Sequence, residues 1–269
     1  MIKDISNNLC MQLLVSTMYQ TDYSLLNKIG IESDVIVINQ CNENSEKIFS
    51  YEGYQIIWVN TTDRGLSRSR NKAIQYATAD ICLLVDDDEV LCSGYKKIII
   101  DAFCKYPAIS VIGFQVKGIE SEFKIYSAKE CKVGYIRSLR MSSVEIAFVR
   151  KHVVDKRIMF DEKIGAGTKY MKGEENSFLY SCLRNHLKIY YIPKLISYIH
   201  MSESTWFRGF NSSYLYASGA AFTSMSRTWS IFLILQFAIR KRTLFKGIVS
   251  PLKMFFIMMQ GRKDYLSES

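Results

Sequence analysis

Four short apolar runs, separated by polar segments, mark the first hundred residues of the chain. They cover residues 12–16, 34–38, 55–59 and 80–85. Nearly continuous apolar runs of this length are typical of strands covered on both faces of a parallel sheet. We therefore predict four buried strands in the N-terminal part of the chain.

A helical spacing follows the third of these runs. Apolar side chains recur between residues 66 and 77 as they do on one face of an amphipathic helix. Strand–helix–strand order implies right-handed crossovers, and such sheets bind ligands at the carboxyl ends of their strands. The pattern predicts an α/β fold with a mostly parallel central sheet flanked by helices.

The remainder of the chain is less regular. Strands are predicted at 109–116 and 145–150, a helix at 173–184, and two short strands at 188–192 and 195–199 on either side of Pro193. Two further apolar stretches, 229–239 and 248–259, predict a C-terminal helical extension. Each is shorter than the roughly 20 residues that cross a bilayer.

The composition of the chain limits the number of domains and the cellular compartment that we expect. The 269 residues are 48% hydrophobic and 23% charged, as in ordinary globular proteins, and we expect one catalytic domain with an appendage. The seven cysteines are scattered and none forms a C-x-x-C pair, which is typical of a reducing compartment. The N-terminus has no charged region followed by an apolar run, so we expect a cytoplasmic protein.

The net charge of +9 is concentrated near the C-terminus. Residues 201–269 hold nine Lys and Arg against three acids, 9 − 3 = +6. This charge lies beside the apolar stretches, which favours helices lying on an anionic membrane surface and argues against a nucleic-acid-binding protein. The alternative is a pair of helices that pack on the catalytic core.

Consecutive carboxylates end the fourth apolar run. Asp86, Asp87 and Asp88 follow Leu83-Leu84-Val85 directly. Such charges repel one another unless a cation neutralises them, and Mg²⁺ binds one or two carboxylates together with substrate phosphates. A solvated acidic turn is the alternative interpretation of this run.

Two other segments carry candidate chemistry. R-G-L-S-R-S-R-N at 64–71 precedes the predicted helix, where free N–H groups and arginine forks suit phosphate oxygens; a basic, capped helix start is the alternative. Two glycines at 165 and 167 are followed by Gly173-Glu174-Glu175, where the acids complement a helix N-terminus. Adjacent helical residues diverge by about 100°, so both glutamates cannot act on one atom.

Together these motifs resemble those of one enzyme family. The order L-L-V-S-T, V-I-N-Q-C, R-G-L-S-R-S-R-N, V-D-D-D and G-E-E is similar to that of the inverting GT-A glycosyltransferases of family 2, in particular the bacterial capsular and surface polysaccharide enzymes. The resemblance covers roughly residues 11–205. It implies a GT-A catalytic domain at 1–204, with a nucleotide-sugar-binding half at 1–116 and an acceptor half at 117–204, followed by a basic, apolar helical extension at 205–269.

The resemblance also implies roles for individual residues. The implied donor-binding residues are Ser16, Thr17, Asn42, Arg70, Asn71, Asp86 and Asp87. The implied ligands of Mn²⁺ or Mg²⁺ are Asp88, Asp86 and His200, although a histidine after a strand is also a common structural residue. Glu175 is implied as the general base with Glu174 as its helper, although this chain has Glu where the family usually has Asp.

The activity implied is a metal-dependent, hexosyltransferase-type transfer from a nucleoside-diphosphate sugar, a UDP-sugar by expectation, to a glycan or lipid-linked acceptor. Transfer proceeds in a single displacement that inverts the anomeric carbon. A peripheral protein at the inner face of the cell membrane is expected. The alternative function is a non-catalytic GT-A protein that binds carbohydrate or nucleotide.

Overall fold

The computed structural model describes residues 9–201 and 209–268. The strands are β1 (Met11–Met18), β2 (Asp34–Gln40), β3 (Ser45–Tyr51), β4 (Tyr54–Thr61), β5 (Ile81–Asp86), β6 (Glu89–Leu91), β7 (Val111–Gly118), β8 (Cys131–Val133), β9 (Ile146–Val149) and β10 (Ile189–Ile199). The helices are α2 (Ser24–Ile29), α3 (Leu66–Tyr76), α4 (Tyr95–Lys105), α5 (Tyr135–Ser138), α6 (Arg150–Asp155), α7 (Glu174–Arg184), α8 (Ser212–Met225), α9 (Ser230–Arg240) and α10 (Pro251–Ser267), with 3₁₀ turns η1 (Ser143–Glu145) and η2 (Arg242–Phe245).

The chain divides into two compact units. The first holds the described residues of 9–64, 68–159 and 182–201, and the second holds 65–67, 160–181 and 209–268. The predicted division at residue 204 falls in 202–208, which lie outside the described residues, and it stays a prediction.

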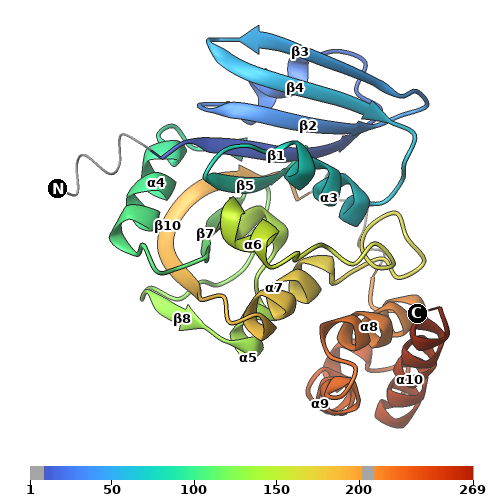
Figure 1. Ribbon diagram of the computed structural model, residues 1–269. Helices are drawn as coiled ribbons and strands as arrows, with labels where there is room; N and C mark the ends of the chain where they lie inside the picture. The colour runs from blue at the N-terminus through green and yellow to red at the C-terminus, as the bar shows by residue number, and fades with distance from the viewer. Residues whose placement is uncertain (1–8, 202–208, 269) are drawn as a thin grey trace. The chain divides into compact units, whose positions relative to one another are not determined.

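All strands of the described residues lie in one sheet of the first unit. Their order is β3-β4-β2-β1-β5-β9-β7-β10-β6, and β8 also pairs with β10. Figure 1 shows the first five of these strands in this order. The central strands β4, β2, β1 and β5 are parallel, as the apolar runs predicted. The short strand β9 is inserted antiparallel between β5 and β7.

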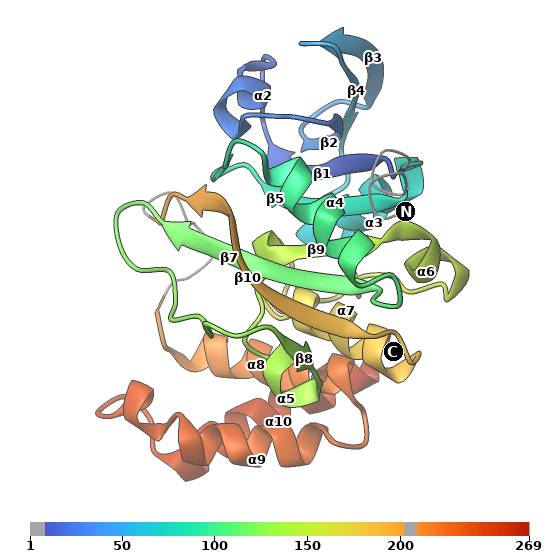
Figure 2. The ribbon, with the colours of Figure 1, turned by 90° about the vertical axis from the view of Figure 1, so that its left-hand side faces the viewer.

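Helices cover both faces of the sheet because the strands are apolar on both. Leu13 and Val15 of β1 pack in a core with α2 and α4. Their neighbour Leu14 points to the opposite face and is also buried, as are Ala73 and Ile74 of α3. Figures 1 and 2 show α4 and α3 on opposite sides of these strands.

The strand β10 differs from the prediction. Two short strands were expected around Pro193, whereas the structure has one strand from Ile189 to Ile199. Its pairing with β7 shifts register between Tyr191 and Leu195. Proline cannot donate to the ladder, and the irregularity accommodates it without ending the strand.

The second unit is helical, and two glycines set its closest helix packing. A Cβ at Gly219 of α8 would lie 1.9 Å from the carbonyl oxygen of Met258 in α10. A Cβ at Gly261 of α10 would lie 2.0 Å from the carbonyl oxygen of Tyr216 in α8. The two backbones approach this closely only because neither position carries a side chain. The C-terminal helical extension is thus an ordered bundle.

Candidate active site

The carboxyl ends of three parallel strands bring the first candidate residues together. Thr17 of β1 is in register with Asn39 of β2, and Ser16 of β1 is in register with Asp86 of β5. Ser16, Thr17 and Asn39 are all buried. Polar side chains at adjacent strand ends therefore line one edge of the sheet, the edge at which open α/β sheets bind ligands.

The acidic run forms a tight turn between β5 and β6. Asp86 ends β5, Asp87 and Asp88 form the turn, and Glu89 begins β6. Glu89 is fully buried and accepts hydrogen bonds from the Asp86 backbone N–H (2.9 Å) and from Ser197 Oγ (2.8 Å). Burial, and then the neighbouring charge of Asp86, raise the pKa of Glu89 well above its usual value. Glu89 therefore fixes the shape of the turn from inside.

Asp86 is paired with an arginine. Arg70 Nη2 of α3 lies 3.0 Å from Asp86 Oδ1 and 3.3 Å from Oδ2. The Arg70 side chain is only 1% exposed, whereas that of Asp86 is 26% exposed. Ser143 Oγ approaches the same carboxylate at 3.4 Å. A protein cation thus neutralises the first carboxylate of the run and leaves part of it accessible.

The hydroxyl groups at the end of β1 bind the turn and the helix α3. Thr17 Oγ1 donates to Asp87 Oδ2 at 2.6 Å, and Gln20 Nε2 donates to the same hydroxyl. Ser69 Oγ of α3 donates to Ser16 Oγ at 2.8 Å. Of the predicted donor-binding residues, Ser16 is therefore bonded to the helix that supplies Arg70, and Thr17 is bonded to Asp87 in the turn.

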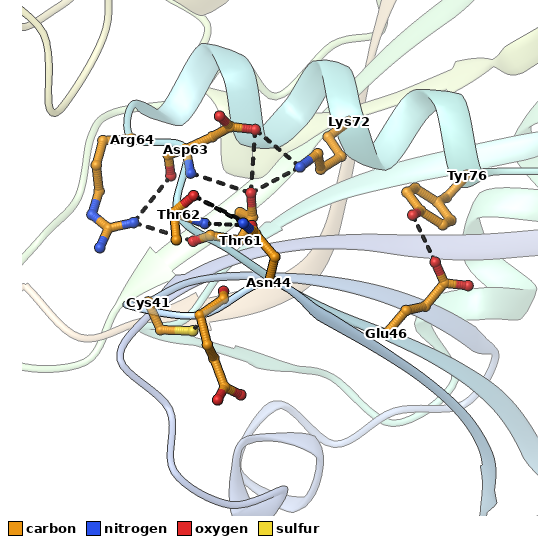
Figure 3. Close-up of polar contacts among 10 residues, drawn as sticks. Cys41, Asn44, Glu46, Thr61, Thr62, Asp63, Arg64, Lys72 and Tyr76 are labelled. Atoms are coloured by element: carbon orange, nitrogen blue, oxygen red, sulfur yellow. Dashed lines mark hydrogen bonds and ion pairs between the residues drawn. The ribbon is translucent and has the colours of Figure 1, made fainter.

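The loop before α3 is held by a polar network. Lys72 Nζ donates to Thr61 Oγ1 (2.8 Å) and Asp63 Oδ2 (3.0 Å), and the hydrogen bond from Lys72 lowers the pKa of Asp63 (Figure 3). Arg64 donates to the Thr61 carbonyl at 3.1 Å. Its other terminal nitrogen donates to Asn42 Oδ1 at 2.9 Å. The predicted donor-binding residue Asn42 is exposed, and it accepts this hydrogen bond from Arg64. The predicted donor-binding residue Asn71, in contrast, is buried, with 3% of its surface exposed.

The other two metal-ligand candidates, Asp88 and His200, are joined by a backbone hydrogen bond. The His200 backbone N–H donates to the Asp88 carbonyl at 2.9 Å. The ring nitrogen Nδ1 of His200 lies 2.8 Å from Glu120 Oε1. An ionised carboxylate only accepts, so Nδ1 carries the proton and Nε2 is left for another partner. The hydrogen bond from His200 lowers the pKa of Glu120 to about 2.

A carboxylate behind a histidine is the usual outer support of a metal-bound imidazole. Within residues 9–201 and 209–268, no three His, Cys, Asp or Glu side chains group as a metal site. A cation that shares one or two protein ligands with a diphosphate needs no such group. Among the described residues, the structure therefore does not group Asp86, Asp88 and His200 as a three-ligand site, and their binding of a cation together with a substrate diphosphate stays a prediction.

The candidate base residues belong to the second unit. Helix α7 begins at Glu174, which is 6% exposed, whereas Glu175 is partly exposed. Gly165 has φ +110°, and a Cβ there would lie 3.1 Å from the Glu174 carboxyl carbon. Ser67 Oγ donates a hydrogen bond of 2.7 Å to the carbonyl of Ile164, the residue before Gly165. Gly165 thus allows the 165–167 loop to pack on Glu174, while the Glu175 side chain is partly exposed.

Several residues of these networks were not singled out from the sequence, among them Glu89, Glu120 and Ser143. Glu89 follows the three aspartates directly, so its position was a signal, although its burial was not visible. Glu120 lies 80 residues before His200, and no local pattern joins the two.

The family model for "Glycosyl transferase family 2" matches residues 16–160. This span is more than half of the chain and includes Ser16, Thr17, Arg70 and the acidic turn. The chain belongs to glycosyl transferase family 2. As a member, it is a glycosyltransferase by class, and the family resemblance of the motifs is confirmed. Glu174, Glu175 and His200 lie beyond the matched residues of the family 2 model.

Solved structures support the GT-A fold of this family 2 chain. Residues 1–349 of S. aureus TarS in complex with UDP-GlcNAc match with a TM-score of 0.67 and 15% identity, over 96% of this chain and 81% of that one. The complex of the same fragment with UDP matches with a TM-score of 0.63 and 13% identity, over 97% and 92%. The chain covers 49% of the longer S. aureus TarS structure, with a TM-score of 0.63 and 16% identity. None of the curated proteins compared matches the sequence.

Proposed function

We propose that this family 2 glycosyltransferase moves a sugar from a nucleoside-diphosphate donor, a UDP-sugar, to a glycan or lipid-linked oligosaccharide acceptor. The transfer inverts the anomeric carbon and serves the synthesis of capsular or other surface polysaccharide. The protein works at the inner face of the cell membrane. S. aureus TarS was solved in complex with UDP-GlcNAc and with UDP, which supports the choice of donor.

One observation carries the proposal: Arg70 holds Asp86 at the edge of the sheet, and Thr17 holds Asp87 beside it. Side chains held by buried partners are pre-organised, so little conformational freedom is lost when a ligand binds. Asp86 and Asp87 would take the ribose and the nucleotide side of the donor. Ser16, Asn42 and Asn71 supply further hydrogen-bonding groups to the nucleotide.

Asp88, Asp86 and His200 would hold Mn²⁺ or Mg²⁺. When bound, such a cation neutralises the charge that develops on the departing diphosphate. Glu120 keeps His200 in the tautomer with a free Nε2. Arg70 adds a fixed positive charge that balances Asp86, so the turn can meet an anionic diphosphate without carrying its full negative charge.

Glu175 is the proposed general base, which takes the proton from the acceptor hydroxyl during the single displacement. Its partial exposure supports this choice, because a base must reach a group that enters from solvent. Glu174 is largely buried and packs against the 165–167 loop, so its proposed role is to position that loop and its neighbour.

The experiment is a screen of UDP-, GDP- and dTDP-sugars for nucleotide release by the purified chain with Mn²⁺. We expect release from a UDP-sugar, and we expect Asp88→Asn to lower it by about 100-fold or more. Asp101→Asn, an exposed aspartate on α4, is the matched control. Turnover retained in Asp88→Asn would refute the proposed site. Binding of UDP without release from any sugar would instead favour a non-catalytic binding protein.

A further inference from the structure

The C-terminal helices carry an unusual distribution of charge. From residue 205 to residue 263 the sequence has nine Lys and Arg and no Asp or Glu. Five of these cations lie between the last residue of α9 and the first turn of α10, and all five are exposed: Arg240, Lys241, Arg242, Lys246 and Lys253. This segment therefore presents positive charge with no acid of its own to neutralise it.

Helix α9 is turned so that its large apolar side chains face away from its bundle. Its buried residues are Ser230, Ile234 and Ala238, which recur at every fourth position. The exposed residues Ile231, Leu235 and Ile239 recur at the same spacing, one position later. A helix that only packed on a core would bury the larger set, so the exposed stripe requires another explanation.

The exposed apolar residues continue beyond α9. Trp229 precedes the helix and is 68% exposed, and Phe232 on its first turn is 61% exposed. Leu244 and Ile248 follow in and after η2. Leu252 and Phe256 lie one turn apart on α10 and are 68% and 61% exposed. Exposed apolar side chains thus extend from residue 229 to residue 256, and the five cations lie among them from residue 240 to residue 253.

A pocket of about 640 Å³ opens within the same segment. Arg242 and Lys246 line it together with Ile248 and the backbone that enters α10 at Ser250 and Pro251. A guanidinium and an ammonium group beside an apolar side chain suit a phosphate group that is attached to an apolar molecule.

We propose that the surface formed by α9, η2 and the first turns of α10 binds an anionic phospholipid bilayer, and that the Arg242–Lys246 pocket takes a lipid phosphate. Exposed Trp, Phe, Leu and Ile beside clustered Lys and Arg are the residues that place a helix in the headgroup region. Among the described residues, no helix is both long and apolar enough to cross a membrane.

The charge decides between a bilayer and a second copy of this chain. Two copies meeting through this surface would bring like charges together with no acid to pair them. An anionic lipid surface complements the same charges and receives the apolar side chains. The inference rests on the proposed transferase only in naming the membrane as its working place; the surface itself is independent of the catalytic residues.

The test is flotation of the full chain with vesicles of phosphatidylcholine alone or with 30% phosphatidylglycerol. We expect at least tenfold stronger partition into the anionic vesicles, and a loss of binding at high salt. Arg242→Glu/Lys246→Glu should abolish most of this binding. Lys132→Glu/Lys156→Glu makes the same change of charge at exposed positions of the other unit and should lower binding less than twofold.

The apolar contribution has its own variant pair. Phe232→Ser/Leu235→Ser should weaken partition by tenfold or more, whereas Ile125→Ser/Ile136→Ser, which alters two exposed apolar residues elsewhere, should not. Nucleotide release in the absence of vesicles is expected to be the same in all four variants, which separates this proposal from the proposed activity. Equal partition into neutral and anionic vesicles, an equal loss in the control variants, or a dimer that Phe232→Ser/Leu235→Ser dissociates would overturn the proposal.

Discussion

Arg70 Nη2 lies 3.0 Å from Asp86 Oδ1, and the arginine side chain is 1% exposed. The pair joins the helix α3 to the end of strand β5, two elements that the sequence predicted separately. A buried guanidinium costs desolvation free energy that the carboxylate offsets, so each member constrains the other. The position of Asp86 at the sheet edge therefore depends on α3.

Arg70→Lys tests this dependence. Lysine keeps the charge but lacks the planar fork, so we expect the affinity for UDP to fall by about tenfold or more. Arg68→Lys, on the same helix but exposed, should change it by less than twofold. Titration calorimetry with UDP gives both values. An unchanged affinity in Arg70→Lys would mean that the pair has no part in nucleotide binding.

Thr17→Val removes the donor to Asp87 while preserving the shape of the side chain. A hydrogen bond to a charged group contributes about 1.5–3 kcal/mol, and we expect the free energy of unfolding to fall by about 2 kcal/mol. Urea unfolding measures this change. Thr78→Val, at an exposed threonine after α3, is the control, and an equal effect at the two sites would contradict the importance of the Thr17–Asp87 bond.

Glu120→Ala should release the His200 ring. If His200 binds the proposed cation, the loss of its supporting carboxylate should weaken Mn²⁺ affinity in the presence of UDP by about 10- to 100-fold. Glu120→Gln retains an acceptor for Nδ1 and should restore part of the affinity. The dissociation constant from Mn²⁺ spin-resonance titration is the measurement. Glu122→Ala, in the same loop, is the control and should leave the Mn²⁺ affinity unchanged. An unchanged Mn²⁺ affinity in Glu120→Ala would mean that His200 is not a ligand of the cation.

The two glutamates at the start of α7 should respond differently. Glu175→Gln is expected to lower UDP release from the UDP-sugar by about 1,000-fold with UDP affinity unchanged, because the base that activates the incoming hydroxyl is lost. Glu174→Gln should lower release less, because Glu174 packs against the loop. Glu162→Gln alters an exposed glutamate of the same unit and serves as control. A larger effect at Glu174 would reverse the assignment.

The buried thiols should be inert in the folded protein. The seven cysteines all lie in the described residues and are free, and burial raises the pKa of Cys82 and of Cys182 to about 12. At pH 8 the thiolate fraction of each is then about 10⁻⁴, and it rises tenfold with each pH unit. Mass spectrometry after iodoacetamide treatment should find both unmodified while the exposed Cys10 reacts. If Cys82 reacted as fast as Cys10, the burial of Cys82 would be contradicted. As a control, all seven cysteines should react with iodoacetamide once the protein is unfolded in urea.

The sequence by itself determined the four parallel strands, the helix α3, the end of β5 in a run of acids, and the family. It did not predict the strand β3, whose residues are mostly exposed and carry no apolar run. These features depend on local spacing, since a buried strand and an amphipathic helix each impose a period on the residues that form them. The parallel core β4-β2-β1-β5 and the helix α3 follow the predicted ranges closely. Pro193 misled the prediction because a proline can also sit at an irregularity within one continuous strand.

Only the tertiary structure decided the partners of the site residues. Arg70 meets Asp86 and Thr17 meets Asp87 because two crossovers return the chain to the same sheet edge, and Glu120 meets His200 across 80 residues. Side-chain exposure was equally hidden: the apolar run in α9 has the same letters whether its large residues face the bundle or the solvent. Spacing along the chain fixes a residue's face on its own element, whereas packing with distant elements decides what covers that face.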